Sequence, residues 1–143
     1  MKKIINFTSL FVFMVLLVGC MGEEKRQLTR VDVQKIDTEG NYEDVVMITD
    51  SEAIELLRQA FEQIKWDNNM VKMEMARKPD IKATLFYTFD ENMPEKLYEY
   101  KIWFNENAGT ATIISNNENA SYGELDKDNL KALKKIFLNK RVI

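Results

Sequence analysis

The chain has 143 residues, of which 23 are acidic and 20 basic, and it contains one cysteine and no histidine. The missing histidine excludes serine–histidine hydrolase triads and histidine zinc sites, and a lone cysteine excludes a disulfide framework. A net charge of −3 gives no basic face for nucleic acid, and no glycine-rich phosphate loop is present, so we expect neither a nucleic-acid partner nor a cofactor.

The amino terminus has the pattern of a secretory signal peptide. A basic start precedes an apolar run from Leu10 to Val18, which is short for a membrane span of roughly 20 residues. Leu17-Val18-Gly19-Cys20 has the form of a lipobox, in which the Cys20 thiolate receives a diacylglyceryl group and the chain is cut before it. Two acyl chains give stable anchoring.

We therefore predict that residues 1–19 are a lipoprotein signal peptide and that 20–27 are the lipidated cysteine and a short tether. A single domain is expected over 28–143, on the extracytoplasmic face of the cell membrane, because the positive end of the signal stays in the cytoplasm. The alternative interpretation of the amino terminus is an uncleaved membrane helix with an incidental cysteine.

The first half of the domain predicts two strands and a helix. Residues 28–36 alternate apolar and polar side chains, and 42–48 contain a run, Val45-Val46-Met47-Ile48, that suggests burial on both faces. Thr49 and Glu52 have the spacing of a capping box. The apolar stripe of the helix that follows is Ile54, Leu57, Phe61 and Ile64.

The second half predicts a meander and a final helix. A short edge strand is expected at 71–75, followed by strands at 81–89, 98–104 and 110–115. The last helix begins at an N-cap Asp126 and ends near Asn139. The predicted fold class is α+β: an antiparallel sheet of about four to five strands, with two amphipathic helices on one face.

Four short motifs resemble the YhfM-like family of small Bacillus-type lipoproteins. The resemblance covers roughly Leu28 to Leu138, and Ile81 stands where that family tends to carry an aromatic residue. It implies this fold and a lipid anchor, and it implies no activity. The motifs are Ile48-Thr49-Asp50, Pro79-Asp80-Ile81, Tyr100-Lys101-Ile102-Trp103-Phe104 and Ser121-Tyr122-Gly123-Glu124-Leu125.

Phe86 and Trp103 are the candidate contact residues, because each points away from the apolar face of its own strand. Antiparallel pairing through the 90–97 loop is expected to place Trp103 near Thr84 and diagonal to Phe86. An exposed aromatic pair would form a contact patch for a partner protein. The alternative is that a loop or terminal strand covers both rings in a second small core.

The other candidate sites have local explanations. Acidic clusters are expected at strand edges, hairpin loops and helix caps, so no catalytic residue is predicted from them. A methionine trio could bind copper(I) but is more typical of core packing, so no metal site is predicted. The clusters are Glu43-Asp44, Asp90-Glu91 and Asp126/Asp128, and the trio is Met70, Met73 and Met75.

The function expected from these patterns is a non-enzymatic, lipid-anchored module that binds an envelope protein. The motivation is the anchor at Cys20, the missing catalytic residue types and the aromatic pair. Two alternatives remain open at this point: a lipoprotein that binds a small ligand or a metal, and an enzyme that uses two convergent carboxylates.

Overall fold

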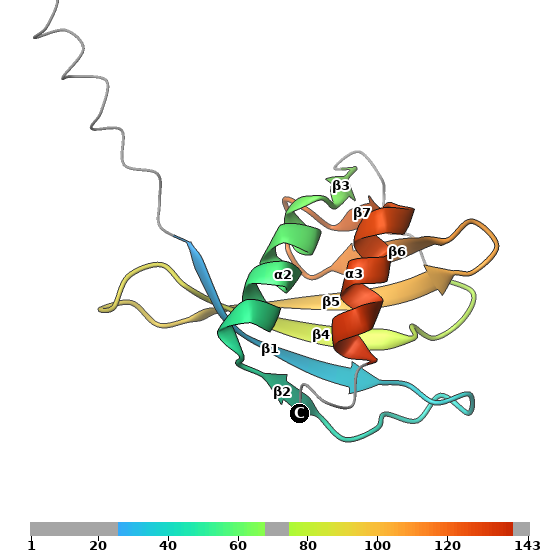
Figure 1. Ribbon diagram of the computed structural model, residues 1–143, viewed down its shortest axis with the longest axis horizontal. Helices are drawn as coiled ribbons and strands as arrows, with labels where there is room; N and C mark the ends of the chain where they lie inside the picture. Colours follow the sequence, from blue (N-terminus) through green and yellow to red (C-terminus); the bar gives the residue numbers. More distant parts are fainter. Residues whose placement is uncertain (1–25, 68–74, 139–143) are drawn as a thin grey trace, which may run out of the picture.

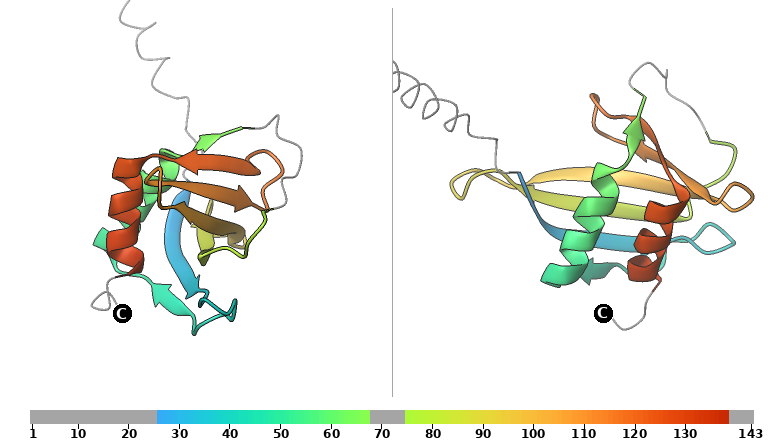
Figure 2. Two further views of the ribbon diagram at one scale, coloured as in Figure 1. Left: turned by 90° about the vertical axis from the view of Figure 1, so that its right-hand side faces the viewer. Right: turned by 45° about the horizontal axis from the view of Figure 1, so that its top comes forward.

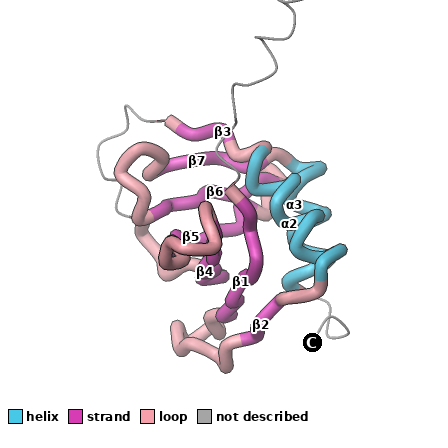
Figure 3. The backbone as a smooth tube through the Cα atoms, turned by 90° about the vertical axis from the view of Figure 1, so that its left-hand side faces the viewer, coloured by secondary structure: helices cyan, strands magenta, loops and turns pink. Residues whose placement is uncertain are grey.

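The computed structural model describes residues 26–67 and 75–138 of the chain (Figure 1). In these residues seven strands form one antiparallel sheet in the order β2-β1-β4-β5-β6-β7-β3, and two helices cover one of its faces (Figures 2 and 3). The elements are β1 (Gln27–Lys35), β2 (Val46–Ile48), α2 (Ser51–Glu62), β3 (Lys65–Trp66), β4 (Ile81–Thr88), β5 (Lys96–Asn105), β6 (Thr110–Ser115), β7 (Tyr122–Leu125) and α3 (Lys127–Phe137). The predicted α+β class, with one antiparallel sheet and two helices, is confirmed.

The predicted number of strands is wrong, because the sheet has seven strands within the described residues and not four to five. β3 and β7 have two and four residues, which is too few for an alternating pattern to identify them as strands. They pair with each other through Lys65 and Glu124. Gly123 allows this pairing, because a Cβ atom there would lie 2.5 Å from Cγ2 of Ile64.

The core lies between the sheet and the helices. On β4 every second side chain, from Ile81 to Tyr87, is buried, as the alternation predicted. Leu57 of α2 and Leu133 of α3 are fully buried against this face. Ring contacts continue the core: the centroids of Phe61 and Tyr100 are 5.4 Å apart, edge to face. Within the described residues, no helix is long and apolar enough to cross a membrane.

Both helices begin at an aspartate. The Asp50 carboxylate accepts a hydrogen bond from the Ala53 amide at 3.0 Å, so the N-cap of α2 is Asp50 and the capping box predicted at Thr49 is wrong by one residue. Asp126 accepts from the Asn129 amide at 2.9 Å and caps α3 as predicted. That bond to the carboxylate lowers the pKa of Asp126 below its usual value.

The strand expected at 42–48 is shorter than predicted and lies at the edge of the sheet. Regular pairing with β1 covers Val46 to Ile48 only, and Tyr42 contributes an isolated bridge to Ile36. Val45 and Met47 are 53% and 61% exposed, so burial on both faces is wrong. An edge strand has no neighbour to cover its outer side. Most of the strand expected at 71–75 lies outside the described residues.

Candidate functional site

A pocket of about 560 Å³ lies at one end of the sheet, where the segment before β4 meets the end of β5 and the turn into β6. It combines two carboxylates, one guanidinium and two side-chain amides with an aromatic ring. Convergent polar groups of this kind are a feature of ligand sites. Its lining residues are Arg77, Asp80, Phe104, Asn105, Glu106, Asn107 and Ala108.

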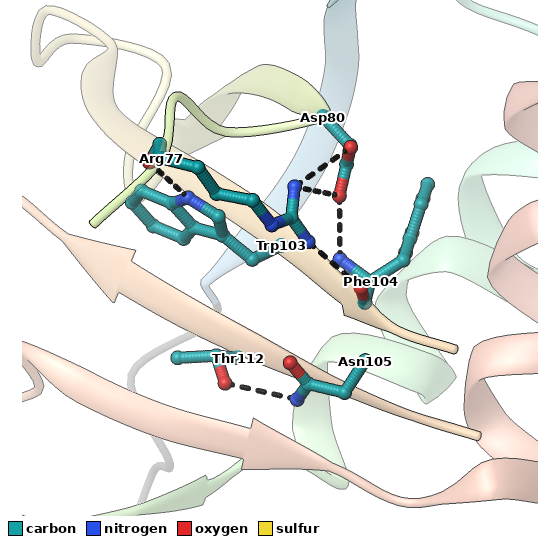
Figure 4. A network of polar contacts seen from close by, with 6 residues as sticks. All are labelled: Arg77, Asp80, Trp103, Phe104, Asn105 and Thr112. Carbon is teal, nitrogen blue, oxygen red and sulfur yellow. Dashed lines mark hydrogen bonds and ion pairs between the residues drawn. The ribbon is translucent and has the colours of Figure 1, made fainter. Parts of the chain in front are cut away.

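Asp80 fixes this end of the sheet. Its backbone amide donates to the Ile102 carbonyl at 2.9 Å, which continues the pairing of β4 with β5 by one residue. Its carboxylate accepts from the Phe104 amide at 2.7 Å and from Nη1 of Arg77 at 3.0 Å, as Figure 4 shows. Charge-assisted bonds of this kind are short and directional. Asp80 therefore holds Arg77 against the end of β5.

Arg77 contributes a fixed and accessible positive charge. Besides its ion pair with Asp80, it donates from Nη2 to the Phe104 carbonyl at 2.8 Å, and its side chain is 51% exposed. A guanidinium carries five N–H donors. Three hydrogen bonds to the described residues engage it, two of them from Nη1 to the same carboxylate. At least two donors are therefore left for an anion or a developing negative oxygen.

Trp103 supports the backbone of this segment. Its indole Nε1 donates to the Arg77 carbonyl at 2.8 Å, and the side chain is only 4% exposed. In Figure 4 the indole lies beside the Arg77 side chain. A buried indole N–H requires a partner, so Trp103 and Arg77 position each other from adjoining elements.

The turn from β5 to β6 supplies the second carboxylate. Asn105 donates from Nδ2 to the Thr112 hydroxyl at 3.1 Å, and Gly109, at a φ of 71°, closes the turn. Glu106 lies in this turn, is exposed, and makes no hydrogen bond or ion pair with the residues that the structure describes. Both of its carboxylate oxygens can therefore accept hydrogen bonds from water or from a ligand.

The structure separates the two aromatic residues singled out from the sequence. The register of β4 and β5 places Phe86 opposite Leu97 and brings Trp103 to Asp80, so the expected position of Trp103 near Thr84 is wrong. Arg30 covers Phe86, with its guanidinium carbon 3.9 Å from the ring centroid. Six residues of strand, roughly 20 Å, separate the two rings. That either ring contacts a partner stays a prediction.

The carboxylates of the pocket were not among the acidic clusters considered from the sequence. Asp80 belongs to the Pro79-Asp80-Ile81 motif, and Glu106 lies between the strands predicted at 98–104 and 110–115. None of the clusters lines the pocket, and within the described ranges no group of three or more metal-ligating side chains forms. Met70 and Met73 lie outside the described residues, as does Cys20.

Comparisons with known proteins include an informative match to a solved structure. No protein-family model matches the chain, and no curated protein matches it. The chain is similar to a solved structure of a thioesterase-like protein from Clostridium sporogenes, with a TM-score of 0.52 and 26% sequence identity. The match covers 82% of this chain and 99% of that one.

This similarity contradicts the function expected from the sequence. The non-enzymatic interaction module was inferred from missing histidine and cysteine, but the match is to a thioesterase-like protein along nearly its whole length. The expectation failed because residue types were used to exclude catalysis in general, whereas they exclude only histidine and thiolate chemistry. The YhfM-like resemblance stays a prediction.

Proposed function

We propose that the chain is a hydrolase of acyl thioesters that works with carboxylate chemistry at the pocket of Arg77, Asp80 and Glu106. The similarity to a thioesterase-like protein carries the proposal, because it extends over 82% of the chain. The pocket supports it independently, since it brings an unengaged carboxylate and a guanidinium with two remaining donors to the same cavity.

Glu106 is proposed as the general base and Arg77 as the group that stabilises the oxyanion. Glu106 takes a proton from water while the water oxygen bonds to the thioester carbonyl carbon. The carbonyl oxygen becomes negative and is bound by the two remaining donors of Arg77. The carbon–sulfur bond then breaks, the carboxylic acid forms, and the thiolate leaves and takes up the proton from Glu106.

A thioester suits a site that has no histidine. The departing thiol has a pKa of about 8.5, so it leaves as a thiolate without a strong general acid. An amide or alkyl ester would need its leaving nitrogen or oxygen to be protonated. Asp80 is a positioning residue in this scheme, because its oxygens are already engaged by Arg77 and by the Phe104 amide.

We also propose that the protein is held at the extracytoplasmic face of the membrane by lipid on Cys20. The lipobox and the basic start of the signal support this location. β1 begins next to Thr88, at the end of β4 opposite to Asp80. Eight strand residues, roughly 25 Å, therefore separate the tether end of the sheet from the pocket, and the pocket would accept its substrate from outside the bilayer.

The anchor is tested by Cys20→Ala, followed by metabolic labelling with a fatty acid and by the mass of the mature chain. We expect loss of the label and accumulation of the unprocessed precursor, because sulfur is the nucleophile for lipid transfer. Normal labelling and maturation of the variant would show that the lipobox is not used.

The proposed activity is tested by release of free thiol from a panel of acyl thioesters, with Glu106→Gln as the decisive variant. A general base contributes roughly 10²- to 10⁴-fold, so we expect kcat to fall by about 100-fold or more. Arg77→Lys should also lower kcat, because lysine keeps the charge and loses the planar fork.

Glu118→Gln is the matched control, because Glu118 is also an exposed glutamate in a turn between adjacent strands of the sheet. It should leave the rate unchanged. If the chain hydrolyses no member of the panel, or if Glu106→Gln and Glu118→Gln have equal rates, the assignment of this pocket as a hydrolytic site is wrong.

A further inference from the structure

A second pocket lies on the helical face and shares no lining residue with the polar pocket. It has a volume of about 710 Å³ and a mainly apolar lining, contributed by α2 and α3, which lie side by side in Figures 1 and 2. Leu56 remains 45% exposed there. The lining residues are Leu56, Lys131, Ala132, Lys134, Lys135 and Ile136. The volume lies within the range of small-molecule sites, about 300–1,000 Å³.

This second pocket is a groove between α2 and α3, and the charges around the groove are asymmetric. α3 contributes three lysines to the lining, and none of them forms an ion pair with the residues that the structure describes. The Nζ atom of Lys134 lies 4.6 Å from the ring centroid of Phe104. α2 carries acids at Glu52 and Glu55 beside Leu56, and Glu55 is engaged by Arg58. The positive charge is therefore concentrated on one side of an apolar floor.

We propose that this groove binds one molecule of a long-chain carboxylate. The alkyl chain lies on Leu56, Ala132 and Ile136, where its burial stabilises the complex by about 25 cal/mol per Å². The carboxylate meets Lys131 and Lys135, because a lysine ammonium is a compact charge with three donors. In the opposite orientation the ligand carboxylate would lie beside the acids of α2, which would repel it.

A single amphiphile fits these charges better than a bilayer surface does. A membrane surface would contact both helices at once, and the anionic leaflet would then meet the acids of α2 as well as the lysines of α3. The chain is acidic as a whole, with a net charge of −3. A monomer contacts only the basic side of the groove.

The experiment is photolabelling of the full chain, expressed with its own signal sequence and reconstituted in phosphatidylcholine nanodiscs. The probe is hexadecanoic acid with a diazirine near the end of its chain, and the labelled peptides are identified by mass spectrometry. We expect saturable labelling of peptides from α2 and α3. Unlabelled hexadecanoate should compete, whereas the uncharged hexadecanol should compete at least tenfold less well.

Two variants assign the label to the groove. Leu56→Glu places a charge on its exposed floor, and the double variant Lys131→Glu, Lys135→Glu reverses its basic side; each should reduce labelling at least tenfold. Leu97→Glu is the matched control, because Leu97 is a leucine of similar exposure on β5, 53% against 45% for Leu56, and it should label normally.

Labelling that is absent, that does not saturate, or that hexadecanol abolishes as well as hexadecanoate would overturn the proposal. Equal labelling of Leu56→Glu and Leu97→Glu would overturn it too. The outcome is independent of the hydrolytic site, since Glu106→Gln should label like the unaltered chain whether or not that chain hydrolyses thioesters.

Discussion

The two faces of the sheet follow different physical rules. The face under α2 and α3 is apolar, with Leu85 and Ile113 fully buried at its centre. The opposite face carries ion pairs, such as Lys82 with Glu99 at 3.2 Å. It also carries aromatic rings that are each covered by a single cationic side chain, as Arg30 covers Phe86. Trp103 differs from these rings, because it is buried and its indole donates a hydrogen bond to the Arg77 carbonyl. The helical face stabilises the fold, and the end of the opposite face builds the polar pocket.

The assignment of fold stability to the helical face is tested most strongly by comparing two variants, Leu133→Ala and Leu56→Ala. Both are helix leucines, but Leu133 is fully buried and Leu56 is 45% exposed. Removing a buried leucine side chain leaves a cavity and costs about 2–5 kcal/mol of unfolding free energy. An exposed one costs about 0.5 kcal/mol or less. Denaturant unfolding measures both, and similar losses would mean that α3 does not cover the core.

The same contrast explains what the sequence could predict. Alternation over 81–89 predicted the buried face of β4, and the N-cap Asp126 predicted the start of α3. These signals are local, because they depend on side-chain period and capping. β3 and β7 could not be found in this way, because their pairing depends on a contact between segments far apart in the sequence. Gly123 allows that contact, since it has no side chain to clash with Ile64.

The pocket depends on register, which the sequence did not specify. The predicted register placed Trp103 near Thr84, whereas the observed register brings it to Asp80. The difference is a shift of four residues. An even shift keeps every side chain on its own face, so Trp103 was assigned the correct face and the wrong neighbours. Asp80 thereby meets the Phe104 amide, and Arg77 comes to the same pocket as Glu106. No local pattern around Glu106 could indicate this.

Trp103→Phe sharpens the comparison with an intermediate effect. Phenylalanine keeps an aromatic ring but loses the hydrogen bond from Nε1 to the Arg77 carbonyl, which is worth about 1 kcal/mol. We expect a loss of that size in denaturant unfolding, together with slower thioester hydrolysis, because Arg77 is held less firmly. Phe86→Leu is the control on the same face and should leave hydrolysis unchanged. If the two variants slow hydrolysis equally, Trp103 has no particular role in positioning Arg77.

The smallest expected effect concerns the start of α3, which connects the helical layer to β7. Hydrogen bonding by the Asn129 amide is the main cause that lowers the pKa of Asp126 below its ordinary value of 3.8. The folded state therefore binds this proton more weakly than the unfolded state does. The stabilisation is present above that ordinary pKa and is lost as the pH falls through the lower folded value.

Asp126→Asn keeps an acceptor at the N-cap and removes the titration. We expect the variant to lose less stability than the unaltered chain as the pH falls below about 4, measured by denaturant unfolding at several pH values. Asp37 and Glu55, whose pKa values are also lowered, keep contributing to the slope in both proteins. Identical slopes for the two proteins would show that the Asp126 carboxylate is not bound by the helix amide, and the cap would then differ from the one that starts α3 in the structure.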